Sequence, residues 1–532
     1  MRKILAIGLD AVCLDILSPW VSQGHLPSIE NLLNKGVYSE LRSTIPPWTA
    51  PAWTSLVTGK NPGKHGIFDF FKRGNEYESS LVSSRDNKAK AIWDYLSAAG
   101  KKVIVINVPI TNPAVKVNGI LIPGYLATEP PTCHPPHILE EINEALGEYR
   151  VYSKYDSQPA PSKKKLRGFL EVTALRTEAA IYLGSKYDWN FLMVEYQKTD
   201  GVFHECRKEE HILEFFKFID QCIGRLVETL GIDANIFLFS DHGIGKCDWV
   251  FAINSWLEKE GLLKAKGVGK MVRSLEQEKQ RLIGCEGSPY QLNLAYALMG
   301  YLGKLGVSIE NIDKLLSLLH LEFPKRIAPH GLIDKVPQRI VDEVNSMAYC
   351  PSPSSLGIRI NAKACEEYQT FRSQLIEKLI SLEDLEGNPV FETVLPREEC
   401  YYGPNMADAP DIVFIPREMN HFVTALILNK IFSPNNKYNH KMNGFFFAQG
   451  EDIRSDGHLG STLSIYDVAP TILHAMGMPI PRDMDGRVLT EIFKEGTEPA
   501  RREIIYQETE AEDEKERIKR QVKELKSPGD IS

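Results

Sequence analysis

Residue types that bind divalent cations stand directly after short apolar runs of the chain. The carboxylates and imidazoles at these places are Asp10, Asp200, His204, Asp241 and His242. A sixth ligand type, His440, comes just before another apolar run. Mixed carboxylate and imidazole donors suit zinc, manganese or iron, whereas ligands that are all oxygen would indicate magnesium or calcium.

Thr49 adds a hydroxyl at the expected start of a helix. Pro51 is tolerated in a first helical turn, and Gly59 can end the helix that Ala52 to Val57 would propagate. A helix N-terminus offers free backbone N–H groups and a positive dipole, so it favours a phosphate. Taken alone, a Thr at this position is also explained by helix capping.

Spacing connects two of the ligand types. Asp200 and His204 are four residues apart, so they share a face if they lie on one helical turn. Each residue has an ordinary structural explanation, such as a turn for Asp10 or a surface loop for His440. As a set, six nitrogen or oxygen ligands and a hydroxyl are what two divalent ions about 4 Å apart require.

The apolar runs predict buried strands, and amphipathic stretches between them predict helices. The predicted strands are 2–9, 102–107, 190–196, 235–240, 411–415 and 444–448, and the main predicted helices are 88–99, 166–184 and 208–230. Strands that alternate with helices indicate an α/β fold. Because ligands gather at the carboxyl ends of strands in such sheets, the polar residues that follow the strands are expected to converge.

The pattern of strand-like and helix-like stretches divides the chain into three regions. We expect a catalytic core from residues 1–263 and 400–500, and an inserted cap from 264–399 with helical stretches at 273–283, 310–319 and 367–382. Residues 501–532 form a charged tail, in which 508–526 interleave both signs as a solvated helix does.

Bulk composition limits the classes of function. The 532 residues are 43% hydrophobic and 25% charged, with a net charge of -8, so we expect no nucleic-acid polymer as a partner. Nine cysteines occur without a CxxC pair, which favours free thiols in a reducing compartment. No apolar run reaches the roughly 18 residues that span a bilayer, and we expect a cytoplasmic protein.

The ordered set of motifs resembles the alkaline phosphatase superfamily and, within it, the type I phosphodiesterase/nucleotide pyrophosphatase family. The matching motifs are GLDA at 8–11, TAPAWTSLVTGKNPGKHGI at 49–67, TDGVFH at 199–204, SDHG at 240–243 and NHKMNG at 439–444, with a closing region at 464–489. The resemblance implies an alkaline-phosphatase-like α/β fold, in which a central, mostly parallel sheet is flanked by helices and carries a cap.

The resemblance also implies roles for the site residues. Thr49 would be the nucleophile of a hydrolase that cleaves a phosphodiester or pyrophosphate through a covalent phosphothreonine. Two divalent metal ions, zinc ahead of manganese, would serve as cofactors, and a small phosphorylated compound would be the substrate. One ion would be held by Asp200, His204 and His440, and the other, in contact with Thr49, by Asp10, Asp241 and His242.

The sequence departs from its relatives at one place and leaves alternatives open. Nucleotide pyrophosphatases carry an Asn after the HGI-x-Asp segment, where this chain has Phe70, for which we expect core packing. A phosphomutase or phosphotransferase of the same superfamily, or a non-catalytic binding protein on this fold, stays possible. A sulfatase does not fit, because Trp53 stands where its motif needs Arg. The oligomeric state is open.

Overall fold

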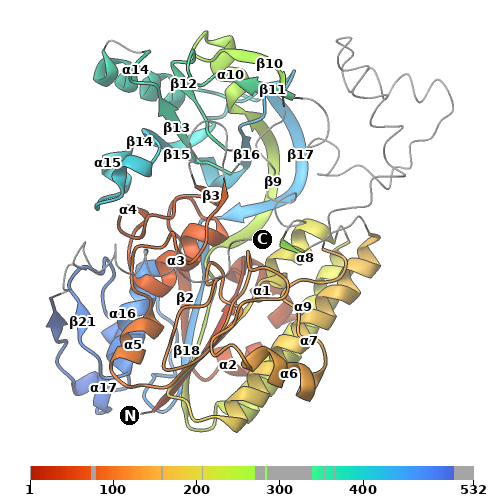
Figure 1. The fold of residues 1–532 in the computed structure, drawn as a ribbon, viewed down its shortest axis with the longest axis vertical. Helices are drawn as coiled ribbons and strands as arrows, with labels where there is room; N and C mark the ends of the chain where they lie inside the picture. The colour runs from red at the N-terminus through yellow and green to blue at the C-terminus, as the bar shows by residue number, and fades with distance from the viewer. Residues whose placement is uncertain are drawn as a thin grey trace.

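The computed structural model describes residues 2–72, 80–156, 160–206, 208–269, 282–283, 338–352, 354–364 and 367–508. Two lobes are stacked along the long axis of the molecule (Figure 1). The upper lobe comprises the described residues of 243–441, and the lower lobe comprises the rest.

A nine-stranded sheet forms the centre of the lower lobe. Its order is β19-β2-β18-β8-β1-β7-β5-β6, with β20 also paired to β2. The strands are β1 (Lys3–Leu9), β2 (Val37–Arg42), β5 (Val103–Ile106), β6 (Gly119–Ile122), β7 (Phe191–Tyr196), β8 (Ala234–Phe239), β18 (Asn443–Gln449), β19 (Gly457–His458) and β20 (Leu463–Ser464). Only β18 runs antiparallel to its neighbours in the pairings of this sheet among the described residues. The predicted mostly parallel α/β sheet is therefore confirmed.

Helices cover both faces of this sheet because its strands are apolar on both sides. Within β1, Leu5 and Ile7 pack into one hydrophobic cluster, and Ile4 and Ala6 pack into the other. The first face carries α1 (Leu14–Ser22), α2 (Pro27–Leu33), α6 (Ile138–Leu146), α7 (Ser162–Lys186) and α9 (Glu209–Leu230). The second face carries α3 (Thr49–Thr58), α5 (Ile92–Ala98) and α16 (Val468–Ala475).

The upper lobe is built on two small sheets that share the third hydrophobic cluster. One has the order β12-β13-β15-β14, from β12 (Ala348–Tyr349), β13 (Gly357–Ile360), β14 (Phe391–Pro396) and β15 (Ile412–Pro416). The other has the order β16-β9-β17, from β9 (Gly243–Ala252), β16 (His421–Thr424) and β17 (Phe432–Lys441). In Figure 1, β9 and β17 run side by side from the lower lobe into the upper one.

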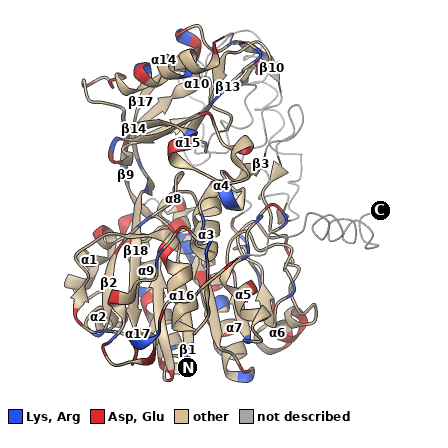
Figure 2. Cartoon of the chain, turned by 90° about the vertical axis from the view of Figure 1, so that its left-hand side faces the viewer, with Lys and Arg blue, Asp and Glu red and all other residues tan. Residues whose placement is uncertain are grey.

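Shorter elements complete both lobes. They are α4 (Pro62–His65), β3 (Phe71–Lys72), β4 (Ser80–Leu81), α8 (Lys198–Glu205), α10 (Ile253–Lys259), β10 (Ala265–Gly269), β11 (Gln338–Val341), α14 (Tyr368–Ile380), α15 (Arg397–Cys400), β21 (Ile480–Pro481), α17 (Glu498–Arg501) and β22 (Tyr506–Gln507). Single 3-10 turns occur at Met406–Asp408, Arg417–Met419, Ile465–Asp467 and Thr490–Ile492. Positively and negatively charged residues are interspersed over both lobes in Figure 2.

The predicted strands and helices form within a few residues of their expected bounds, with two corrections. Residues 119–122, which are not among the predicted strands, form β6. The predicted strand 411–415 forms as β15, but it pairs with β13 and β14 of the upper lobe and not with the core sheet. The upper lobe thus takes strands from both sides of 264–399. The predicted helix 310–319 lies outside the described residues, as do residues 509–526 of the predicted helix 508–526 and residues 273–281 of the predicted helix 273–283.

Two further expectations concern cysteines and membranes. The seven described cysteines, Cys13, Cys133, Cys206, Cys222, Cys247, Cys350 and Cys400, are free thiols, as predicted. Within the described ranges, no helix has both the length and the apolar character needed to cross a bilayer.

Candidate metal and phosphoryl-transfer site

Three neighbouring strands end at the candidate site. Strand β1 lies between β7 and β8 and is parallel to both. Asp10 follows β1, Asp241 and His242 follow β8, and α8, which carries Asp200 and His204, follows β7. The predicted convergence at the carboxyl ends of the strands is therefore observed.

Hydrogen bonds between the three strand ends fix their turns. The Ala11 N–H donates to Asp241 Oδ1 at 3.3 Å, and the Thr199 hydroxyl donates to the Asp10 carbonyl at 2.6 Å. Ala11 has a φ of 58°, so the chain turns sharply as soon as β1 ends. These bonds connect the turn after β1 with those after β8 and β7.

The first cluster of ligand types is Asp200, His204 and His440. His204 Nε2 lies 3.0 Å from Asp200 Oδ1, and His440 Nε2 lies 3.6 Å from the same oxygen. The predicted sharing of one helical turn by Asp200 and His204 is confirmed, because both lie on α8. His440 lies on β17, which follows most of the upper lobe in the sequence. The His204 side chain is 36% exposed, so this cluster opens to solvent.

The second cluster is Asp10, Asp241 and His242. His242 Nε2 lies 3.4 Å from Asp10 Oδ1 and 3.4 Å from Asp241 Oδ2, and all three side chains are fully buried. The His242 ring stacks on the His440 ring of the first cluster, with centroids 3.9 Å apart. In each cluster one ligand atom per residue lies within 4.8 Å of the others. The structure thus places two potential cation sites side by side.

Backbone carbonyls set the histidine tautomers. His440 Nδ1 donates to the Pro47 carbonyl at 2.9 Å, and His242 Nδ1 donates to the Gly243 carbonyl at 3.0 Å. A neutral imidazole that donates through Nδ1 keeps a lone pair on Nε2. Both Nε2 atoms therefore face their clusters as potential metal ligands, which is the arrangement that metal-binding histidines usually have.

The donor atoms fit divalent cations. Among the described residues, Asp10 Oδ1, Asp200 Oδ1, Asp241 Oδ2 and His242 Nε2 are buried without a hydrogen-bond partner. Buried polar atoms are nearly always paired, so four such atoms in one place indicate a missing partner. Carboxylate oxygen and imidazole nitrogen suit zinc or manganese.

The charges of the site lead to the same conclusion. Burial, and then the neighbouring Asp241 and Asp200, raises the pKa of Asp10 well above its ordinary value, and burial raises the pKa of Asp241 in the same direction. Burial also opposes ionisation of Asp200, but the adjacent His204 outweighs it and lowers the pKa of Asp200. Burial lowers the pKa of His242 to about 4, so its ring stays neutral at pH 7. The crowded carboxylates Asp10 and Asp241 beside the neutral His242 ring favour the binding of a positively charged ion.

Thr49 is the first residue of α3, as predicted, and it is buried. Gly59 ends the helix with a φ of 67°, a left-handed conformation that glycine adopts at little cost. The Thr49 hydroxyl lies near the Asp10 carboxylate, whose ionised form it favours. All seven predicted site residues therefore lie in one region, and the hydroxyl lies against the second cluster.

The position after HGI-x-Asp behaves as expected. Phe70 is buried in the third hydrophobic cluster and makes an edge contact with Tyr125, at 6.4 Å between ring centroids. Its predecessor, Asp69, accepts hydrogen bonds from Ser352 and Ser354 of the upper lobe, at 2.5 Å each.

Two aromatic neighbours of the site were not predicted. Trp53 donates its indole N–H to Asp10 Oδ2 at 3.2 Å, and Trp48 contacts the His440 ring edge-on at 4.7 Å between centroids. The spacing of four residues between Thr49 and Trp53 could have indicated that Trp53 shares the site face of the helix.

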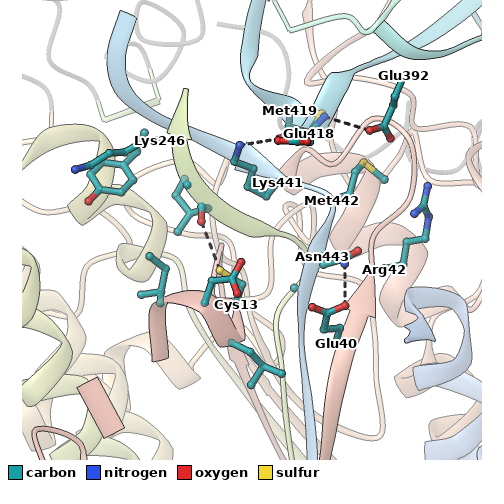
Figure 3. Close-up of a pocket in the computed structure, with 17 residues that line it drawn as sticks. Cys13, Glu40, Arg42, Lys246, Glu392, Glu418, Met419, Lys441, Met442 and Asn443 are labelled. Atoms are coloured by element: carbon teal, nitrogen blue, oxygen red, sulfur yellow. Dashed lines mark hydrogen bonds between the residues drawn. The ribbon is translucent and has the colours of Figure 1, made fainter. Parts of the chain in front are cut away.

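A cavity of about 620 Å³ lies at the junction of the lobes and is distinct from the site (Figure 3). None of the seven predicted site residues is among the described residues that line it. Lys441 points into it and donates to the Glu418 carbonyl and Asn420 Oδ1, both at 2.7 Å. Consecutive strand residues point to opposite faces, so the His440 side chain lies on the face of β17 toward the candidate site and the Lys441 side chain on the face toward the cavity.

Comparison with known proteins places this geometry in a family. The family model for type I phosphodiesterase / nucleotide pyrophosphatase matches residues 4–294, more than half of the chain. Ectonucleotide pyrophosphatase/phosphodiesterase family member 1 of Mus musculus is 26% identical over 261 residues, which are 48% of this chain and 25% of the mouse protein. The chain therefore spans only about a quarter of that relative's length.

Solved structures show the same fold. Human ectonucleotide pyrophosphatase / phosphodiesterase 5 superposes with a TM-score of 0.52 at 13% identity, over 93% of this chain and 100% of that one. Wild-type alkaline phosphatase PafA superposes with a TM-score of 0.52 at 14% identity, over 93% and 99% of the two chains. The predicted alkaline-phosphatase-like fold is therefore confirmed. By the match over residues 4–294, the chain belongs to the type I phosphodiesterase / nucleotide pyrophosphatase family.

Proposed function

We propose that the protein is a two-metal phosphoesterase that hydrolyses a phosphodiester or pyrophosphate bond through a covalent phosphothreonine at Thr49. The observation that carries the proposal is the hydroxyl of Thr49 at the N-terminus of α3, near Asp10 and beside two adjacent ligand clusters. Asp200, His204 and His440 would hold one ion, and Asp10, Asp241 and His242 the other.

The chemistry divides into two displacements. Thr49 Oγ1 attacks phosphorus, and the P–O bond to the leaving group breaks as the Oγ1–P bond forms. The leaving oxygen keeps the electron pair and takes up a proton. Water then attacks the phosphothreonine, which restores the Thr49 hydroxyl and releases the phosphorylated product. When bound, two divalent ions supply nucleophile activation and offset negative charge on the phosphoryl group.

The chain's own residues orient this reaction. Asp10 lies near the Thr49 hydroxyl, and the first N–H groups of α3, which have no partner within the helix, can donate to the non-bridging phosphoryl oxygens. Water reaches the site beside His204, the exposed ligand. The substrate is a small phosphorylated compound, and zinc or manganese is the expected metal. The cytoplasmic location stays a prediction.

The first experiment compares hydrolysis of bis-p-nitrophenyl phosphate and p-nitrophenyl phosphate with added zinc or manganese. We expect diester turnover by the wild type and a loss of at least about 1,000-fold in kcat/KM for Thr49→Ala. Thr58→Ala is the matched control, because Thr58 is a buried threonine of the same helix whose hydroxyl only donates to the Thr54 carbonyl.

Each result bears on the proposal. Equal losses in the two variants would overturn the nucleophile assignment, because they would show a general effect on the helix. No turnover by wild-type protein that holds two ions would overturn simple ester hydrolysis. Phosphoryl transfer to an added alcohol would then establish the transferase alternative.

A further inference from the structure

Trp53 joins the helix of the nucleophile to the strand that ends at Asp10. It lies four residues after Thr49 on α3, so both side chains are on one face of the helix. Its ring is fully buried, and its Nε1–H donates to Asp10 Oδ2 at 3.2 Å. One helix therefore carries both the candidate nucleophile and the indole that donates to Asp10.

Strand β1 leaves room for this ring. Gly8, two residues before Asp10, has no side chain, and a Cβ added there would lie 2.4 Å from Cη2 of Trp53. Real Cβ atoms essentially never approach so closely. The indole therefore lies directly against the strand backbone, and the pair of Gly8 and Trp53 sets the distance between β1 and α3.

The indole makes the two carboxylate oxygens of Asp10 differ in their hydrogen bonding. Oδ2 accepts the N–H of Trp53, whereas Oδ1 has no hydrogen-bond partner among the described residues and lies 3.4 Å from His242 Nε2. We propose that Trp53 is a positioning residue that holds Asp10 so that Oδ1 alone is presented to a cation. This inference rests on the proposed function, because it takes Asp10 as a ligand.

The test measures zinc binding and does not depend on turnover. Wild type, Trp53→Phe and Trp189→Phe are titrated with zinc against a chromophoric chelator. Trp189 is the matched control, because it is a buried tryptophan whose Nε1–H donates to the Gly184 carbonyl at 3.0 Å, away from the clusters. We expect Trp53→Phe to weaken one of two zinc sites by about 10- to 100-fold, and Trp189→Phe to weaken neither.

Zinc affinities of Trp53→Phe that match those of Trp189→Phe would overturn the inference. Asp10→Asn separates this failure from that of the proposed function. If Asp10→Asn leaves both zinc sites intact, Asp10 is not a ligand, and the proposed function fails together with the inference. If Asp10→Asn removes a site that Trp53→Phe leaves intact, only the inference fails.

Gly8→Ala tests the contact between β1 and the Trp53 ring from the side of the strand. The added Cβ must displace the indole, so we expect Gly8→Ala to weaken the same zinc site as Trp53→Phe. In a Trp53→Phe background, the smaller ring should make the effect of Gly8→Ala on zinc affinity smaller than in the wild type. Equal effects in both backgrounds would overturn the role of this contact, even if Trp53→Phe alone folds poorly.

Discussion

At the scale of single residues, His65 is a buried histidine whose two ring nitrogens are both used. Nδ1 accepts the Ile67 N–H at 3.1 Å, so Nε2 carries the proton and lies 2.9 Å from the Ser55 hydroxyl. Burial, and then the positive charge of Lys60, lowers the pKa of His65 to about 3. The ring is therefore neutral in the folded protein at every ordinary pH.

This neutral ring predicts a loss of stability in acid. Below pH 6.5 the unfolded chain protonates His65 and the folded chain does not, so the free energy of unfolding falls as the pH falls from 6.5 towards 3. The slope attributable to His65 approaches about 1.4 kcal/mol per pH unit. Urea unfolding of the wild type and His65→Gln between pH 7 and 5 measures it. Parallel pH dependences of the two proteins would contradict the prediction.

Individual site residues could be predicted because of their chemical type and their position after a strand. Asp10, Asp241 and His242 needed no knowledge of contacts, since strand ends of an α/β sheet meet at one edge. The contact of Trp53 with Asp10 could not be predicted in the same way. It depends on how α3 packs on β1, which local sequence does not determine. The neutral tautomer of His440 likewise depends on the Pro47 carbonyl, which is distant in sequence.

At the scale of elements, α8 is held at both of its ends by ion pairs. Lys198 at its start pairs with Asp156 at 2.6 Å, and both side chains are almost completely buried. Glu205 at its end pairs with Lys165 of α7 at 2.5 Å. Because α8 carries Asp200 and His204, these pairs connect the first cluster to α7 and to the segment before it.

Lys198→Met should destabilise the protein by roughly 3–5 kcal/mol, because it leaves the Asp156 carboxylate buried without its cation. Urea unfolding in the presence of a chelator measures this loss without a contribution from metal. Replacing both partners, as Lys198→Met with Asp156→Leu, should cost less than the single change. A double variant as unstable as Lys198→Met, or more so, would refute this explanation.

The element predictions succeeded where an apolar run had clear ends and failed where a partner had to be known. Strand β6 is only four residues long within a segment rich in Pro and Gly, so its composition indicated a loop. The run at 411–415 was correctly predicted as a strand, yet its sheet could not be assigned. Apolar strands of the two sheets have similar sequences, because a hydrophobic pattern indicates that a strand is buried and not which strands it pairs with.

At the scale of the whole molecule, hydrogen bonds connect the two lobes at a place other than β9 and β17. The partly buried carboxylate of Asp69 accepts hydrogen bonds from Ser352 and Ser354, and Asn61 exchanges hydrogen bonds with the backbone of Tyr402. These contacts lie on the stretch that follows the helix of the nucleophile. The upper lobe is therefore attached to the lower lobe through this stretch as well as through β9 and β17.

Ser352→Ala with Ser354→Ala should loosen this attachment. The loss of two hydrogen bonds to a partly buried carboxylate should cost about 3 kcal/mol in the free energy of unfolding. Limited proteolysis should cut the upper lobe faster than in the wild type. Ser381→Ala, which removes an exposed hydroxyl of the upper lobe, is the control and should change neither quantity. Unchanged proteolysis of the double variant would show that the fastening lies elsewhere.

The ribbon of β9 and β17 restricts how this protein could exchange parts with its relatives. His440 pairs with Ile244 and Phe432 pairs with Phe251, and the register shifts once between them, at Pro434 to Lys437, so a metal-ligand type and the entry to the upper lobe lie on one ribbon. A chimera that replaces the upper lobe must be spliced above Phe251 and Phe432. A splice that shifts the pairing by one residue would turn His440 to the opposite face. Recombination and design can therefore vary only the part of the upper lobe that lies beyond the Phe251–Phe432 pair.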